Sequence, residues 1–445
     1  MRRSSLAIAL TIAAAVPALP GCRPGDPFAS ELAVPDTTLI ARDIRVLAAD
    51  SLEGRRTGTV GNDSAAAFLA RRLAMLGLEP LATDSACARG NGSSNGRCAL
   101  SHTQPFVARP AAAQHAGLPG ALPTRNVVGL IRGSDPVLRH QYVVLGAHFD
   151  HLGRSTFGAL DPERGSEIRN GADDNASGTA AVLELARLLR QRPPRRSVVF
   201  VLFSGEELGL LGSQHFVEHP PVPLDSIQAM LNFDMVGRLR NDRLIVYGVA
   251  SATEMDSIVN GANLTPPLRI SAVGDGFGPS DHSSFYAKNL PVLHFFTDLH
   301  EDYHRATDDA PQIALEGVAR VVALAERITR TLADRPSRLT FVRAPVSAAA
   351  SPRNSSQAWL GTVPDMGAND VSGLRITGVR AGSPADSAGL REGDVIVELG
   401  GAPVKDLYTY SDALYAHQPG DRVTIVYLRG GQRHTVQATL GRRGG

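Results

Sequence analysis

Residues 197–207 read SVVFVLFSGEE, the most informative stretch of the 445-residue chain for its architecture. The first seven residues, Ser197–Phe203, are almost all apolar, which is typical of a strand buried on both faces of a parallel sheet. Glu206 and Glu207 follow shortly after this strand. Binding sites in open parallel sheets form beyond the carboxyl ends of the strands. The stretch therefore predicts a buried parallel strand with an acidic site at its end.

Predicted strands and helices alternate on both sides of this stretch. Short apolar runs indicate the other strands, and apolar residues recurring with a period near 3.6 indicate the helices. The predicted elements are strands 142–145, 227–233 and 292–296, helices 176–190 and 313–332, and a helical region over 37–78, with 82–123 irregular. This alternation predicts an α/β fold, a three-layer sandwich with a mixed, largely parallel sheet, over residues 37–334.

Histidine and acidic side chains stand at the ends of the predicted strands or just before the main helix. Because such ends meet at one edge of a parallel sheet, we expect these side chains to converge. Carboxylates held close together repel one another, and metal cations remove that conflict. Imidazoles combined with carboxylates form a ligand set that suits zinc. The candidate metal ligands are His148, Asp174, Glu207, Asp234 and His304.

The charge of this group indicates two metal ions rather than one. Asp174, Glu207 and Asp234 carry three negative charges, and two Zn²⁺ with one bridging hydroxide balance them. Asp150 lies two residues after His148 on an extended segment, so both side chains share a face. Asp150 would therefore orient the ring of His148.

A second zinc motif lies in an unsuitable setting. Residues 300–304 read HEDYH, which matches HExxH, the endopeptidase signature that requires a helix to place both histidines on one face. Here the stretch follows a strand and runs into a loop-like TDDAP sequence. We therefore expect His304, but not His300, to bind metal. His151 and His294 are interpreted as structural or pocket groups.

Five blocks of this region resemble the M28 family of co-catalytic zinc peptidases over residues 37–334. The resemblance implies that His148 and Asp234 bind one zinc, Glu207 and His304 bind the other, and Asp174 bridges both. It implies that Glu206 is the general base acting on a zinc-bridging hydroxide or its parent water. The blocks, in family order, are His148-Phe149-Asp150, Gly171–Gly178, Ser204–Gly209, Asn232–Met235 and Tyr303-His304.

The same resemblance implies an aminopeptidase that hydrolyses N-terminal residues from peptides. Family members often hold a cis peptide bond after the bridging aspartate, here Asp174–Asn175, and a pocket-lining stretch that matches Asp281 and His282. A carboxypeptidase or glutaminyl cyclase of the same fold, or a catalytically silent peptide-binding protein, are alternatives. The five-ligand set argues against a single-zinc cyclase, and the presence of Glu206 argues against a silent protein.

The N-terminus predicts export and a lipid anchor. Residues 1–22 combine Arg2 and Arg3, an apolar core and a lipobox-like end at Cys22, and 23–36 form a tether. Two acyl chains at Cys22 would anchor the protein in a bacterial cell envelope. In that oxidising setting Cys87 and Cys98 are expected to form a disulfide. With a net charge of +1 and 43% hydrophobic residues, the sequence gives no indication of a nucleic-acid partner.

A Pro-, Ala- and Ser-rich linker over 335–357 precedes a smaller β-rich domain over 358–443. The block from Ser383 to Ile396, SPADSAGLREGDVI, resembles PDZ domains of bacterial envelope proteases. The resemblance implies that a peptide adds as a β-strand, with its carboxylate held by backbone N–H groups near Leu360–Thr362. A helix around Tyr410–Ala416 would form the other wall of this groove. A PDZ fold used only for packing or dimerisation is the alternative.

Overall fold

The computed structural model describes the folded parts of the chain. The described residues are 34–83, 100–109, 119–344, 358–364, 373–380, 382–405, 409–410, 413–414 and 416–442. The expected signal sequence, the lipidated Cys22 and the Cys87–Cys98 disulfide lie outside these residues. None of the helices within the described ranges is both long and apolar enough to cross a membrane.

A mixed sheet of nine strands forms the centre of the larger part. The strand order is β1-β5-β7-β6-β8-β11-β9-β10, and β4 pairs with β5. Strands β7, β6, β8 and β11 run parallel to one another, whereas β5 and β9 are antiparallel to their inner neighbours. The strands are β1 (Glu79–Pro80), β4 (Thr103–Ala108), β5 (Leu122–Ile131), β6 (Tyr142–His148), β7 (Ser197–Phe203), β8 (Ile227–Phe233), β9 (Arg243–Tyr247), β10 (Arg269–Val273) and β11 (Val292–Phe296).

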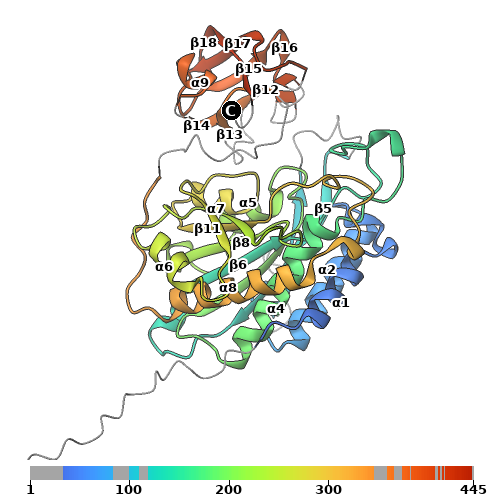
Figure 1. The fold of residues 1–445 in the computed structure, drawn as a ribbon, viewed down its shortest axis with the longest axis vertical. Helices are drawn as coiled ribbons and strands as arrows, with labels where there is room; N and C mark the ends of the chain where they lie inside the picture. Colours follow the sequence, from blue (N-terminus) through green and yellow to red (C-terminus); the bar gives the residue numbers. More distant parts are fainter. Residues whose placement is uncertain are drawn as a thin grey trace, which may run out of the picture. The chain divides into compact units, whose positions relative to one another are not determined.

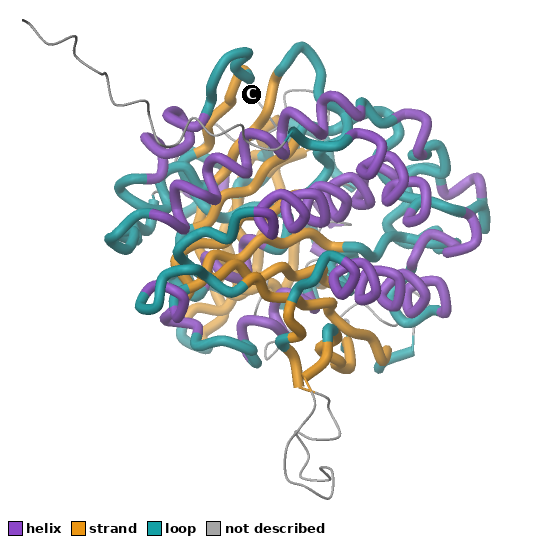
Figure 2. The backbone as a smooth tube through the Cα atoms, turned by 90° about the horizontal axis from the view of Figure 1, so that it is seen from below, coloured by secondary structure: helices purple, strands orange, loops and turns teal. Residues whose placement is uncertain are grey.

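Helices cover both faces of this sheet, which gives the predicted three layers (Figure 1). Helices α1, α2, α4 and α8 pack together in one layer, and α5 and α7 pack together against the sheet in the other. Figure 2 shows the strands of the sheet with helices packed against them. The helices are α1 (Thr37–Leu47), α2 (Val60–Met75), α4 (Gly178–Gln191), α5 (Leu211–Glu218), α6 (Met255–Ala262), α7 (His282–Ala287) and α8 (Leu315–Asp334).

The central strands form where the sequence is continuously apolar. Every residue of β7 and of β8 is buried, because both strands have neighbours on each side and helices on each face. The predicted bounds of β7, β8 and β11 agree with the structure, and β6 extends three residues beyond its predicted end at Leu145 to include His148. The sheet therefore delivers the ends of its parallel strands to one edge.

Two predictions about the N-terminal third were wrong. The helical region 37–78 is interrupted by the short turn η1 (Asp50–Arg55), in which Glu53, Gly54 and Arg55 have positive φ angles that an α-helix cannot contain. The segment 82–123 is not irregular throughout, since it contains β4 and the start of β5, and β2 (Ala82–Thr83) pairs with β3 (Leu100–Ser101). Pro105 lies within β4, an edge strand that can accommodate proline, and this residue weakened the strand signal.

The smaller part is an antiparallel β domain with its own core. Its sheet has the order β13-β14-β15-β17-β18, with β16 paired to β15, and β12 pairs separately with β19. Buried Leu360, Ile376, Ile396, Leu399 and Ile425 form the centre of the core. Residues 409–410 and 413–414 are helical, as predicted for the wall of the groove. The elements are β12 (Ala358–Trp359), β13 (Thr362–Pro364), β14 (Leu374–Val379), α9 (Pro384–Ser387), β15 (Val395–Leu399), β16 (Ala402–Pro403), β17 (Arg422–Arg429), β18 (Gln432–Thr439) and β19 (Gly441–Arg442).

Candidate metal centre

The five proposed ligands come from five separate segments of the chain. His148 is the last residue of β6, Asp234 directly follows β8, and Glu207 lies in the turn after β7. Asp174 belongs to η4 (Ala172–Ser177), a non-α turn that leads into α4. His304 lies in the loop after β11 and has a positive φ of 54°. The structure brings all five side chains together at the carboxyl edge of the sheet.

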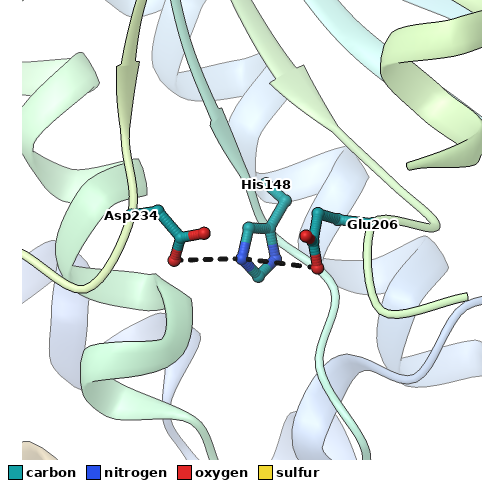
Figure 3. Close-up of side chains that lie close together, drawn as sticks. All are labelled: His148, Glu206 and Asp234. Carbon is teal, nitrogen blue, oxygen red and sulfur yellow. Dashed lines mark hydrogen bonds and ion pairs between the residues drawn. The ribbon is translucent and has the colours of Figure 1, made fainter. Parts of the chain in front are cut away.

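Asp174 lies between two histidines and presents one carboxylate oxygen to each. Its Oδ1 atom lies 3.3 Å from Nε2 of His148, and its Oδ2 atom lies 3.2 Å from Nε2 of His304. Asp234 Oδ1 lies 3.3 Å from His148 Nε2, and Glu207 Oε2 lies 3.3 Å from His304 Nε2. Figure 3 shows His148 between Asp234 and Glu206. Two groups of donor atoms that share Asp174 therefore lie side by side.

The turn that holds Asp174 is fixed by buried hydrogen bonds. Asp308 accepts hydrogen bonds from the backbone N–H groups of Asp173 (2.9 Å) and Asp174 (3.0 Å). The Asn175 side chain donates to Phe233 O at 2.9 Å, which connects the turn to β8. The Asp174–Asn175 peptide bond is cis, as predicted. The bridging position of Asp174 therefore follows from backbone contacts on both sides of it.

Asp150 holds the turn after β7 rather than the ring of His148. Its Oδ1 accepts the backbone N–H of Glu206 at 3.1 Å, and its Oδ2 accepts a hydrogen bond from Thr57 Oγ1 at 2.8 Å. Nδ1 of His148 is 3.8 Å from the Asp150 carboxylate but only 3.1 Å from the Asp150 carbonyl oxygen. The ring is thus oriented by the backbone of Asp150, while its carboxylate positions Glu206.

His151 is part of the cluster, although the sequence analysis assigned it only a structural or pocket role. Its Nδ1 atom lies 2.7 Å from Glu207 Oε1 and 3.8 Å from Asp174 Oδ2. His151, Asp174 and Glu207 offer ligand atoms that lie within 4.8 Å of one another. The signal for this contact was the adjacency of His151 to Asp150, because β6 and β7 are parallel neighbours and the residues that follow them face each other.

The remaining motif residues surround the cluster. Residues 300–304 form turns rather than a helix, so HEDYH is not a helical zinc motif, and His300 Nε2 lies 3.1 Å from Asp173 Oδ2. Asp281 and His282, expected to line a pocket, are both fully buried. Burial raises the pKa of Asp281 to about 7. Ser280, just before them, donates from Oγ to Asp234 Oδ2 at 2.7 Å and so supports a proposed ligand.

The electrostatics of the cluster favour positive charge. Burial alone would lower the pKa of His148, but Asp234 and Asp174 raise it well above its usual value. Burial also opposes charge on His304, whereas Glu207 and Asp174 raise its pKa well above the ordinary range. The pKa of Asp174 would rise through burial, yet its bonds to both histidines hold it well below its usual value. Divalent cations meet the same demand and leave the imidazoles neutral, as metal ligation requires.

Comparison with known proteins agrees with this fold and site. Residues 126–329 match peptidase family M28, and residues 351–440 match the PDZ domain. A probable zinc metalloprotease of Leptosphaeria maculans is 35% identical over 34% of this chain and 32% of its own length. Aminopeptidase YwaD of Bacillus subtilis is 28% identical over 43% of this chain and 41% of its own. The chain thus spans well under half the length of these curated relatives.

Solved structures give the same architecture. A zinc aminopeptidase from Bacillus subtilis superimposes with a TM-score of 0.51 at 18% identity, covering 70% of this chain and 99% of that one. A leucine aminopeptidase precursor from Bacteroides thetaiotaomicron gives 0.53 at 18% identity, covering 67% and 98%. The larger part therefore has the zinc exopeptidase fold. The chain carries a domain of peptidase family M28, a family of zinc-dependent metallopeptidases, followed by a PDZ domain.

Proposed function

We propose that this protein is a two-zinc aminopeptidase that removes N-terminal residues from peptides. The observation that carries the proposal is the position of Asp174, whose two carboxylate oxygens each lie within about 3.3 Å of a different histidine. A carboxylate placed in this way can bind two cations at once. The M28 family match and the aminopeptidase names of the relatives support the same reaction class.

The donor set fits two zinc ions. His148 and Asp234 would hold one, Glu207 and His304 would hold the other, and Asp174 would bridge them. Imidazole and carboxylate groups are common zinc ligands, and three carboxylates roughly balance two such ions. Bound zinc would lower the pKa of a water molecule toward neutrality and polarise the scissile carbonyl group.

Glu206 is suited to move the proton in this reaction. Its backbone is fixed by Asp150, and its Oε2 atom lies 3.9 Å from Nε2 of His148, next to the proposed ligands without being one of them. Its side chain is 12% exposed, so substrate and water can reach it. As general base, Glu206 would take a proton from the attacking water and give it to the leaving amine.

The other sequence predictions complete the proposal. Export and lipidation at Cys22 would place the enzyme in a bacterial cell envelope. Its PDZ groove, near Leu360–Thr362 and the helical residues 409–414, would bind a peptide or protein by strand addition. Export, lipidation and the groove rest on the sequence motifs and on the PDZ match.

The central experiment measures zinc content and turnover of aminoacyl amides and peptides together. We expect about two zinc ions per chain, fewer in Asp174→Ala, and a rate loss of roughly 10²–10⁴-fold in Glu206→Gln with zinc retained. Glu163→Gln changes an exposed glutamate in the turn η3 (Pro162–Arg164) and serves as the matched control. Full activity of Glu206→Gln, or no turnover of any free N-terminal peptide by the zinc-loaded protein, would disprove the proposal.

A further inference from the structure

A pocket with about 250 Å³ of empty space lies directly beside the proposed metal centre. It includes Glu207, a proposed zinc ligand, so a group bound there would belong to a molecule held at the metals. Ligand pockets of this kind combine an apolar wall with a few polar groups that fix orientation. The lining residues are Arg56, Thr57, Asp150, His151, Leu152, Ser155, Phe157, Glu207 and Leu208.

The wall of this pocket is apolar except for one cation and a set of committed polar groups. Leu152 and Leu208 are buried and partly buried Phe157 joins them, which provides surface for a few methylene groups. Asp150 is held by Thr57 and by the backbone of Glu206, and Glu207 contacts His151 and His304. Among the described residues that line the pocket, Arg56 is the only permanent cation.

Arg56 is held in place by both of its neighbours in the chain. Arg55 is fully buried and donates to the carbonyl oxygens of Phe149 (2.7 Å), Asn170 (2.6 Å) and Gly171 (2.9 Å). On the other side, Thr57 is bonded to Asp150. The Arg56 side chain also lies against Gly153, where an added Cβ would come within 2.7 Å of Arg56 Cβ. The backbone of Arg56 is therefore rigid beside the pocket.

The charge of Arg56 is not matched by the acids around it once metals are bound. Zinc ions would neutralise Glu207, and the Asp150 carboxylate is already occupied. Burial lowers the pKa of Arg56, but an arginine remains protonated at neutral pH. A guanidinium partly removed from water gains most from a planar anion, because a carboxylate can accept two parallel hydrogen bonds from it.

We propose that this pocket is a subsite for a carboxylate group of the peptide substrate, with Arg56 as its counter-ion. The proposal rests on the peptidase function proposed above. The carboxylate is either the side chain of an aspartate or glutamate or the free α-carboxylate of a dipeptide. The narrow pocket and its short apolar wall suit either source, whereas a large aromatic side chain exceeds the available space.

Matched substrate pairs test the subsite in the zinc-loaded full-length protein. Leu-Gly against Leu-Gly-amide isolates the α-carboxylate, and Leu-Glu-amide against Leu-Gln-amide and Glu-Gly-amide against Gln-Gly-amide isolate the side chain. Arg56→Gln should lower kcat/KM for the carboxylate member of one pair by roughly 10- to 100-fold and leave the neutral member within about threefold. Arg56→Glu should reverse the preference toward lysine-containing analogues.

Arg154→Gln is the control, since Arg154 is half exposed and bonds to Glu53 at 3.3 Å without lining the pocket. Calorimetric binding of the same pairs to zinc-loaded Glu206→Gln protein, with and without Arg56→Gln, gives a readout that needs no turnover. Equal carboxylate preference with and without Arg56 would overturn the subsite, even if the peptidase activity holds. Arg56-dependent carboxylate binding without any peptide cleavage would instead retain the subsite and reject the peptidase.

Discussion

Replacing His151 by leucine should weaken zinc binding without removing a proposed ligand. The substitution deletes the 2.7 Å hydrogen bond from His151 Nδ1 to Glu207 Oε1, the oxygen that does not face His304. A hydrogen bond to a charged group contributes about 1.5–3 kcal/mol, which corresponds to roughly 10- to 150-fold in affinity. Loss of a contact that orients a ligand typically costs metal affinity by 10- to 100-fold. We therefore expect a loss of about tenfold to a hundredfold.

Competitive zinc titration against a chromophoric chelator measures this loss directly, and total zinc at saturation is determined on the same samples. His151→Asn places an amide N–H near the position of Nδ1, so it should recover part of the affinity. The control is His140→Leu, which changes an exposed histidine in η2 (Leu138–His140). If folded His151→Leu binds zinc within about threefold of the parent protein, the positioning role is refuted. Loss of one zinc even at saturation would make His151 a ligand instead.

Three further predictions concern metal removal and stability. Chelation should lower the unfolding temperature of the M28 domain, because bound zinc stabilises only the folded state, and scanning calorimetry that detects no shift would contradict this. Burial, and then His219, lower the pKa of His215 to about 4, below its unfolded value, so stability should fall as the pH decreases from about 6.5 to 4. Urea unfolding at these pH values should show a loss of about 1–3 kcal/mol, discounted for partial exposure, which His215→Phe abolishes; parallel profiles for the two proteins would exclude His215 as the cause. Arg429→Met should destabilise the PDZ domain by about 1–3 kcal/mol, since Asp394, 1% exposed, pairs with Arg429 at 2.7 Å, whereas Arg433→Met at an exposed 3.3 Å pair should cost under about 1 kcal/mol.

The central strands could be predicted because their signal is local. Continuous apolar runs fix β7, β8 and β11 at their observed bounds, and polar residues mark the points where these strands end. The N-terminal third was less accessible because its structure depends on distant partners. The interruption at η1 exists where buried Arg55 bonds to carbonyl groups of residues 149, 170 and 171, and no pattern within residues 37–78 indicates those contacts.

The proposed ligand set was accessible for a related reason. Parallel strands end at one edge, so polar residues that follow them must converge, and the sequence order of His148, Glu207 and Asp234 already contains this geometry. The contacts of Asp150 and His151 were harder to foresee. Which atom of Asp150 faces His148, and which carboxylate His151 meets, depend on the pitch of two turns that have no sequence signature.

The two dipeptides Asp150-His151 and Glu206-Glu207 make matching contacts across neighbouring strands, since Asp150 holds Glu206 and His151 holds Glu207. Strands β6 and β7 pair with His148 opposite Phe203, and both dipeptides follow from that alignment. A slip of one residue between these strands would separate both contacts at once and turn every side chain of the strand to the opposite face. The alignment of proton acceptor and metal ligand is thus inherited from interior β-pairing, and substitutions deep inside the sheet can alter reactivity without touching a polar group.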